Sequence, residues 1–416
     1  MRSTNLSLPG KARLPLSRCG PKSFSKTLAT TGSHNFLALV LLSALLLIAA
    51  QPAQAQTETV LYNFTGSPDG NDPTSRLTAD SAGNFYGTTY YGGDGSPGFG
   101  TVFELSPNGG GGWNETVLYR FTGGADGAYP AYSDVIFDSA GNLYGTTYRG
   151  GGEFGLGVAF QLTPNGGGWT ESVLHVFKGG EIDGGHPESR LIMDKAGNFY
   201  GTTFSGGNTQ GTVFELSPAP GGTWTERIIY GAKATYAGLT MDAAGNIFGT
   251  TRDQKVFELS PNGNGGWNAS VIHVFTGSPN DGAGPYGTLV FDSAGNLYGT
   301  TRAGGTYTRG TVYELSPGPN GWTERILYSF RGGINPKHPL GGVVLDAAGN
   351  IYGTTTRGTV ATFELVNIGG GSYTFKILCG DGSLASLFLD TAGNLYGTSL
   401  SNPFGGIFGK VFECTP

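Results

Sequence analysis

The sequence is poor in charged residues and in the side chains that most often bind metals. Asp, Glu, Lys and Arg together make up 13% of the 416 residues, and there are three Cys and five His. The spacings H-x-x-H, H-E-x-x-H and C-x-x-C do not occur, so the usual sequence patterns for zinc and redox sites are missing. The G-x-S-x-G elbow of serine hydrolases and the Walker-type loop are also missing. We therefore expect neither a metal nor a cofactor.

Helical periodicity is missing as well, although the chain is rich in Gly and aromatic residues. The 75 Gly and 22 Pro approach the proportion that is typical of low-complexity chains. Disordered chains contain few aromatic residues, however, whereas here 25 Phe, 20 Tyr and 5 Trp recur in short apolar runs separated by Gly and Asn. This pattern predicts many short strands joined by tight turns.

The first 55 residues differ from the rest and are interpreted as a signal peptide with a long basic leader. Residues 1–35 carry six basic residues and no acidic one, an apolar run follows at 36–50, and Ala53 and Ala55 supply small residues for cleavage. The apolar run is shorter than the roughly 20 residues that a membrane span needs. We expect cleavage and a secreted or periplasmic protein without membrane contact; an uncleaved N-terminal anchor is the alternative.

Removal of this leader makes the chain more acidic. The formal net charge is −6, and loss of the six basic residues of the leader takes it to −12. Nucleic acids and anionic membranes bind clustered Lys and Arg, so neither is expected as the main partner, and we expect a monomer. Cys379 and Cys414 remain in a compartment that permits disulfides, where they could pair or stay free.

An internal repeat predicts the fold. The string D-x-A-G-N, followed by an apolar residue, Tyr or Phe, and G-T, occurs seven times in the chain. Each copy precedes a segment of the type G-T-V-F-E-L-S-P, a Gly/Asn-rich turn, and a segment such as 115–121. A short apolar piece then leads into the next copy. Each unit thus contains four strand candidates of four to seven residues, which predicts the four-stranded antiparallel blades of an all-β, seven-bladed β-propeller over residues 56–416.

The two ends of the repeat region indicate how the ring closes. Residues 58–64 copy the fourth strand of the unit without the first three, and residues 411–414 copy the third strand without a fourth. We therefore predict that the N-terminal strand completes the last blade. Closure of this kind removes the exposed strand edges of an open array.

The repeated strings also carry a family resemblance. N-L-Y-G-T-T, G-T-V-F-E-L-S-P and E-T-V-L-Y-x-F together resemble the GloVer-type tandem repeat of exported bacterial proteins, the choice-of-anchor group, over residues 57–416. The resemblance implies a bacterial, extracytoplasmic, propeller-like protein, and it assigns no catalytic residues. Members are named for C-terminal anchors, whereas this chain ends at Pro416 directly after the last strand copy, so we expect release rather than attachment.

The loops predicted for the two faces of the propeller differ. Turns after the first and third strands are uniform, while the loops after the second and fourth strands vary, and variable loops on a rigid scaffold are where sites are usually built. Arg binds carboxylates or sugar hydroxyls, and exposed Tyr stacks on sugars or peptides. The candidate ligand-binding residues on this variable face are Arg76, Asp134, Arg190, Tyr90, Tyr148, Tyr129, His186, Arg252, Arg302 and Tyr286. The alternative is that they are ordinary solvated loop residues.

Two other residue sets receive a structural interpretation. The Asp of each D-x-A-G-N string lacks the further oxygen ligands of a calcium loop, so we expect it to cap the hairpin. His175 and His273 occupy a position where other copies have Tyr, and we expect them to be structural.

Three functions remain open. The first is a non-catalytic binding or cell-surface module that recognises a glycan, peptide or protein on the variable face. The second is a lyase or hydrolase at the mouth of the central channel, using Arg76, Asp134, Arg190 and His186. The third is a structural or assembly role. The first is favoured because aromatic and Arg-bearing loops occur without a recognisable catalytic set.

Overall fold

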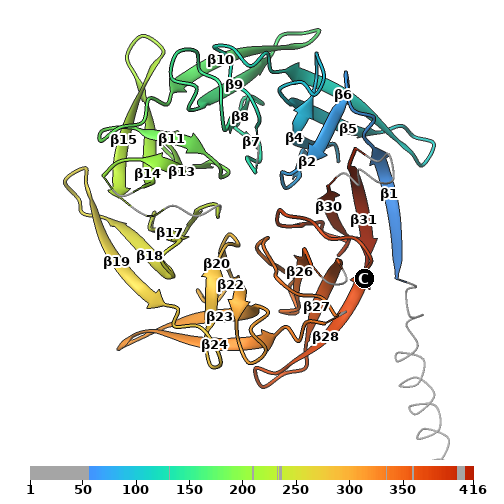
Figure 1. Ribbon diagram of the computed structural model, residues 1–416, viewed down its shortest axis with the longest axis vertical. Coiled ribbons are helices and arrows are strands. Elements are labelled where there is room, and N and C mark those ends of the chain that lie inside the picture. Colours follow the sequence, from blue (N-terminus) through green and yellow to red (C-terminus); the bar gives the residue numbers. More distant parts are fainter. Residues whose placement is uncertain are drawn as a thin grey trace, which may run out of the picture. The chain divides into compact units, whose positions relative to one another are not determined.

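The computed structural model describes residues 56–416, except for residues 131, 209, 232, 234–236, 334, 358–359 and 401–407. The expected signal peptide lies outside the described residues. Within them the chain forms strands β1 to β31 and no helix, so no helix that could span a membrane is found there. The strands form seven separate antiparallel sheets arranged around a central axis (Figure 1). The predicted seven-bladed propeller is confirmed.

The strands of the seven blades follow the repeats in order, from the axis outwards. Blade 1 contains β2 (Gly70–Pro73), β3 (Thr78–Ala79), β4 (Phe85–Gly92), β5 (Thr101–Pro107) and β6 (Trp113–Arg120). Blade 2 contains β7 (Ile136–Phe137), β8 (Leu143–Thr146), β9 (Val158–Pro164) and β10 (Trp169–Val176). Blade 3 contains β11 (Gly184–Pro187), β12 (Ile192–Met193), β13 (Phe199–Gly206), β14 (Thr212–Ala219) and β15 (Thr223–Gly231). Blade 4 contains β16 (Thr240–Met241), β17 (Ile247–Thr250), β18 (Lys255–Pro261) and β19 (Trp267–Val274).

The remaining three blades complete the ring. Blade 5 contains β20 (Gly282–Pro285), β21 (Val290–Phe291), β22 (Leu297–Gly304), β23 (Thr311–Gly318) and β24 (Gly321–Ser329). Blade 6 contains β25 (Val344–Leu345), β26 (Ile351–Thr355), β27 (Ala361–Asn367) and β28 (Tyr373–Cys379). Blade 7 contains β29 (Phe388–Leu389), β30 (Leu395–Ser399), β31 (Lys410–Thr415) and β1 (Thr57–Asn63).

The N-terminal strand closes the ring, as the two ends of the repeat region predicted. β1 pairs antiparallel with β31, with Thr57 opposite Thr415 and Asn63 opposite Lys410. Lys410 Nζ lies 3.3 Å from Glu58 Oε1 and also contacts Asp381, which lies beyond the end of β28. The closing strand is therefore tied by hydrogen bonds and charge to both of the last two blades.

Cys379 and Cys414 form a disulfide, so the pairing that the sequence left open is realised. It joins β28 of blade 6 to β31 of blade 7 across 35 positions of the chain. A cross-link over that length stabilises a fold by roughly 4 kcal/mol in the chain-entropy description. The disulfide thus reinforces the blade that β1 completes.

The D-x-A-G-N strings form the tight hairpins that the sequence predicted. Asp80 Oδ1 accepts the backbone N–H groups of Ala82 and Asn84 at 2.8 and 2.9 Å, and Oδ2 accepts the Asn84 amide at 2.8 Å and the Tyr86 hydroxyl at 3.1 Å. Burial alone would raise the pKa of Asp80, but these hydrogen bonds hold it below its ordinary value. The bonds to the two backbone N–H groups and to the Asn amide recur in the other six blades, so this carboxylate has a hairpin-capping role.

In the G-T pair after each hairpin, the Gly allows close packing within the blade and the Thr forms a hydrogen bond to the next blade. A Cβ at Gly87 would lie 2.6 Å from Phe103 Cζ, so only Gly lets the aromatic ring of the next strand lie over the backbone. Thr88 Oγ1 donates to the Pro130 carbonyl oxygen of the next blade at 2.8 Å. At the closure of the ring, Thr398 Oγ1 donates in the same way to the Ser75 carbonyl oxygen at 3.0 Å.

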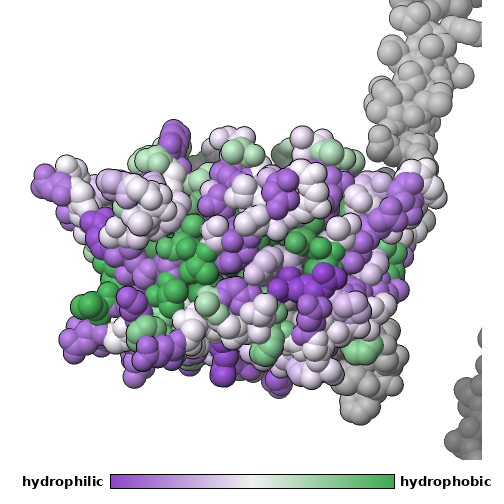
Figure 2. Space-filling view, turned by 90° about the horizontal axis from the view of Figure 1, so that it is seen from above, coloured by the Kyte–Doolittle hydropathy of each residue, from purple (hydrophilic) through white to green (hydrophobic). Residues whose placement is uncertain are grey.

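The core lies between adjacent blades. At successive interfaces, the Phe at the end of one outer strand meets an aromatic ring of the next blade edge-on, as in Phe64–Phe103 at 5.1 Å and Phe121–Phe160 at 5.2 Å. On the outer wall seen in Figure 2, hydrophobic side chains lie in separate patches among hydrophilic ones. Along the first half of an outer strand such as β6, partly buried side chains alternate with exposed ones.

The innermost strands are shorter than predicted. Their regular parts beside the hairpins are only two residues long, as in β3, whereas the sequence predicted at least four. The reason is that a serine hydroxyl replaces a backbone carbonyl as the hydrogen-bond acceptor for the neighbouring strand. Ser75 Oγ accepts the Thr88 N–H at 2.8 Å, and Ser133 Oγ accepts the Thr146 N–H at 2.9 Å. These small residues end the regular pairing where the chain turns toward the axis.

Candidate functional site

One residue of each blade lies directly before the buried Leu or Val of the inner strand, and in six of the seven blades it lines a cavity at the axis. In order around the ring, these seven axis residues are Arg76, Asp134, Arg190, Gly238, Thr288, Gly342 and Ser386. Side chains at this position accept backbone N–H groups of the preceding blade: Thr288 Oγ1 from Gly238 at 2.9 Å, and Ser386 Oγ from Gly342 at 3.0 Å. Hydrogen bonds between neighbouring blades therefore fix the positions of these axis residues.

A cavity of about 550 Å³ opens over these axis residues. Its volume lies within the range of roughly 300–1,000 Å³ that small-molecule sites usually have. Six of the predicted site residues line it: Tyr90, Asp134, Tyr148, Arg190, Tyr286 and Arg302. The variable loops and the inner-strand ends therefore meet at the channel mouth.

Arg76 is not part of the cavity lining. Its backbone N–H donates to Asp134 Oδ1 at 2.7 Å, its Nε donates to the Leu387 carbonyl oxygen at 3.0 Å, and its guanidinium lies 6.0 Å from the Phe388 ring centre. Burial and the nearby Arg190 lower the pKa of Arg76, while Asp134 opposes them. Arg76 thus makes its hydrogen bonds and its aromatic contact within the channel wall.

Asp134 combines a structural bond with a buried charge. It accepts the Arg76 N–H as Thr288 and Ser386 do in other blades, and it is only 7% exposed. Burial raises the pKa of Asp134, although Arg190 and Arg76 both favour its ionised form. The negative charge of this buried carboxylate is therefore stabilised by its two Arg neighbours.

Arg190 is the axis residue with unused hydrogen-bonding capacity. Its Nε is buried and has no hydrogen-bond partner among the described residues. Its stem packs beside Gly238, where a Cβ would come within 2.9 Å of Arg190 Cγ. A buried donor without an acceptor costs about 1–3 kcal/mol, so this guanidinium is suited to an acceptor on a ligand.

Tyrosines on the rim are supported by two further predicted residues. Tyr129 stacks on Tyr90 with ring centres 5.1 Å apart, and His186 packs against Tyr148 at 4.6 Å. Tyr129 and His186 each precede a Pro and have positive φ values of 56° and 57°. A non-Gly residue in that region costs roughly 1–3 kcal/mol and is often found at functional sites. Both residues position the rim tyrosines and lie outside the cavity lining.

The two other predicted Arg residues have different surroundings. Arg302 lines the cavity with its guanidinium 5.8 Å from the ring centre of Tyr286. Arg252 is exposed and lies over Phe204 at 4.8 Å, away from the cavity lining. Of this pair, Arg302 alone contributes to the channel mouth.

Sequence reasoning missed Glu188 and Arg357, which both line the cavity. Glu188 is 7% exposed, and burial raises its pKa to about 7, while Arg252 lowers it in part. Its Oε2 has no hydrogen-bond partner in the described part of the chain. The sequence feature that could have identified Glu188 is its position directly after the Pro of the loop, where another blade has the predicted site residue Tyr286. Arg357 lies near the end of β26, a region comparable to that of Arg302.

The comparisons with known proteins give one family and one fold. A family model described as the Gloeobacter/Verrucomicrobia repeat matches residues 47–256 and 238–416. None of the curated proteins compared with the chain matches it. Among solved structures, a virginiamycin B lyase from Staphylococcus aureus with quinupristin has a TM-score of 0.55 at 13% identity, covering 87% of this chain and 99% of its own. A periplasmic gluconolactonase from Pseudomonas aeruginosa has a TM-score of 0.50 at 16% identity, covering 75% and 86%.

Proposed function

The chain belongs to the Gloeobacter/Verrucomicrobia repeat family, and we propose that it is an extracytoplasmic, non-catalytic binding module for an anionic glycan. The central cavity takes a carboxylate-bearing sugar of that glycan. The observation that carries the proposal is the buried Nε of Arg190, which has no acceptor among the described residues and belongs to a cavity-lining side chain.

The charge of the cavity supports an anionic ligand. Arg190, Arg302 and Arg357 line it, against the carboxyl groups of Asp134 and Glu188. The shifted pKa of Glu188, about 7, leaves much of this carboxyl neutral near neutral pH. A cavity with excess positive charge in a chain of net charge −6 favours an anion, and Arg binds carboxylates through paired hydrogen bonds.

The aromatic rim supports a sugar ring as the rest of the ligand. Tyr90, Tyr148 and Tyr286 line the cavity from three blades, and such rings combine an apolar face with a polar hydroxyl. The extracytoplasmic location is supported by the basic and apolar leader and by the Cys379–Cys414 disulfide, because disulfides persist in oxidising compartments.

The test is a comparison of matched oligosaccharides. We expect oligosaccharides of uronic acids to bind in titration calorimetry, and the same oligosaccharides to lose binding after their carboxylates are reduced to alcohols. Equal binding of the reduced and acidic forms would contradict the anion site. Binding of acidic peptides alone, or of none of these ligands, would overturn the glycan proposal.

Glu188 favours a second candidate, a lyase or hydrolase that uses it as a proton-transfer group. A carboxyl group with a pKa of about 7 in a cavity is suited to general acid–base catalysis. His186, which the sequence placed in such a site, has its Nδ1 2.9 Å from the Tyr148 carbonyl oxygen and lies outside the lining. Cleavage of a bound oligosaccharide by the wild type, lost in Glu188→Gln with binding retained, would favour the enzyme.

Under the binding proposal, Glu188 predicts a pH dependence. Its pKa of about 7 in the folded protein is above its ordinary 4.5, so folding favours the protonated form. The free energy of unfolding should therefore fall as pH rises from about 4.5 to 7. Affinity for the acidic ligand should fall roughly tenfold as Glu188 ionises through pH 7, because one ionised carboxyl repels another.

Glu188→Gln provides the comparison, since it keeps the shape of the side chain and removes its titration. We expect its affinity to vary much less between pH 6 and 8, and calorimetry at both pH values measures this. A wild-type affinity that stays constant over this range would contradict the role given to Glu188.

A further inference from the structure

Two side-chain clusters of the same composition lie between blades, away from the channel mouth. The first joins His175 on β10 of blade 2 to Asp183 and Glu226 of blade 3. The second joins His273 on β19 of blade 4 to Asp281 and Glu324 of blade 5. Within each cluster one imidazole nitrogen and one oxygen of each carboxyl group lie within 4.8 Å of one another.

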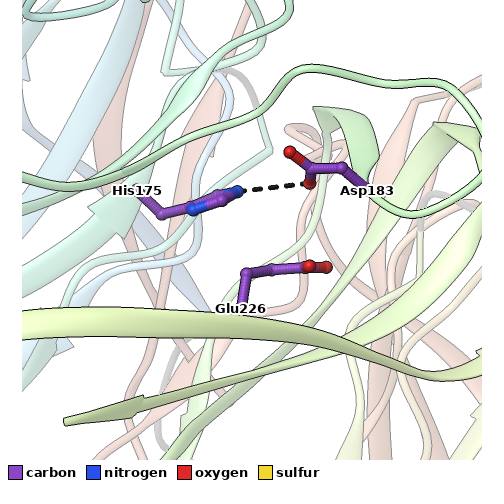
Figure 3. Close-up of side chains that lie close together, drawn as sticks. All are labelled: His175, Asp183 and Glu226. Carbon is purple, nitrogen blue, oxygen red and sulfur yellow. Dashed lines mark hydrogen bonds and ion pairs between the residues drawn. The ribbon is translucent and has the colours of Figure 1, made fainter. Parts of the chain in front are cut away.

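The three side chains of the first cluster converge from three segments of the chain, as Figure 3 shows. His175 Nε2 lies 3.2 Å from Asp183 Oδ1, and Glu226 lies beside both on the outer strand β15. In the second cluster, His273 Nε2 is 3.7 Å from Asp281 Oδ1, too far for a hydrogen bond. Asp183 and Asp281 are buried, with 7% and 8% of their surface exposed.

Asp183 and Asp281 each accept a backbone N–H group of the preceding loop, but other buried polar atoms of the two clusters have no partner within the described ranges. Glu226 Oε1, Glu324 Oε1 and His273 Nε2 are buried and have no hydrogen-bond partner among the described residues. Each cluster also brings two carboxyl groups together in a site with little solvent. A cation between them would offset their repulsion and satisfy the remaining oxygen.

The repeat supplies a comparison for the role of His. On β1 of blade 7, Tyr62 stands where His175 stands, and its hydroxyl donates to Asp69 of blade 1 at 3.0 Å, with Glu115 nearby. At the next interface, Tyr119 donates to Asp126 at 3.1 Å. Tyr thus fulfils the structural role at this position. The carboxyl groups are common to both kinds of cluster, so the imidazole is what distinguishes the two His clusters.

We propose that the two His–Asp–Glu clusters are binding sites for a divalent metal of the zinc type, each linking two neighbouring blades. Imidazole and carboxylate are typical zinc ligands, with bonds of roughly 2.0–2.2 Å. Small side-chain movements would bring ligand atoms that are within 4.8 Å of one another onto one ion. Calcium is disfavoured, because it takes about six to eight oxygen ligands. This proposal revises the purely structural role that the sequence gave to His175 and His273.

Metal binding of this kind would stabilise the ring. The ligands of each ion come from two blades, so the ion binds the assembled interface and not the unfolded chain, and a ligand of the folded state raises the unfolding temperature. The role is independent of the glycan proposal, because the ligands lie outside the lining of the central cavity.

The experiment uses tag-free protein stripped with EDTA and dialysed against zinc. We expect two zinc ions per wild-type chain by elemental analysis, one in His175→Tyr, and none in the double variant His175→Tyr/His273→Tyr. Tyr at these positions copies Tyr62 of blade 7 and Tyr119 of blade 1, so the variants should keep the native circular dichroism spectrum. Zinc should raise the unfolding temperature of the wild type and leave that of the double variant unchanged.

The reciprocal change provides the gain-of-function control. Tyr119→His rebuilds a His–Asp–Glu cluster with Asp126 and Glu171, and we expect a third zinc ion per chain. Absence of zinc from the wild type would overturn the proposal. So would equal zinc content of the wild type and the double Tyr variant, because the metal would then be held elsewhere, as by His186 or His338.

Discussion

A chain that lacks residues 56–64 is expected to lose cooperative unfolding or to melt at least 10 °C lower, which for a domain of this length corresponds to roughly 7 kcal/mol or more. The deletion removes β1 and exposes the edge of β31 in blade 7. It also removes Phe64, which is 3% exposed and packs on Phe103 at 5.1 Å. Loss of a buried Phe side chain alone costs about 3–5 kcal/mol. Thermal unfolding followed by circular dichroism, with gel filtration to detect association through the free edge, measures the effect.

Rescue in trans separates the loss of the strand from a general effect of truncation. A peptide of residues 56–66 should restore cooperative unfolding, because the Cys379–Cys414 disulfide still holds β31 against β28. The same peptide with Phe64 replaced by Ser should not. Removal of residues 1–55 alone serves as the matched truncation and should leave the unfolding temperature unchanged. An unfolding temperature that did not depend on residues 56–64 would contradict closure through β1.

The fold could be predicted because the same physical constraints are repeated seven times. A single D-x-A-G-N string is an ordinary turn signal, but its recurrence with the same flanking apolar strings identifies the hairpin that Asp80 caps. The missing fourth strand at the C-terminus and the extra one at the N-terminus then required that β1 pair with β31. Ring closure was therefore readable from the order of the strand copies.

The candidate site could be predicted only in part, because it is formed by the positions at which the repeats differ in sequence. The inner strands are regular over two residues, so strand alternation could not show which neighbouring side chain faces the axis. His186 was chosen, although it packs on Tyr148 outside the cavity lining, and Glu188, two residues later, lines the cavity. Arg76 and Arg190 occupy equivalent positions, yet only Arg190 has Gly238 as its neighbour around the ring.

Replacement of Arg190 by Met is expected to weaken uronate binding by roughly 10- to 100-fold, because hydrogen bonds between charged groups contribute about 1.5–3 kcal/mol. Met preserves a long apolar stem beside Gly238, and Arg76 remains next to Asp134. Titration calorimetry with an oligouronate measures the loss, and urea unfolding checks that the variant stays folded. Arg331→Met removes an exposed guanidinium that lies over Tyr307 outside the cavity lining, and it should bind as the wild type does.

Gly238→Ala tests the position of the Arg190 guanidinium without removing its charge. The added Cβ would lie 2.9 Å from Arg190 Cγ and must displace the stem. We expect weaker binding of the oligouronate with no change in net charge, an effect that a merely electrostatic role of Arg190 would not produce. Arg190→Lys keeps the charge and loses the paired donors of the guanidinium, so it should recover only part of the affinity. Full affinity in Arg190→Met would exclude the central cavity as the anion site.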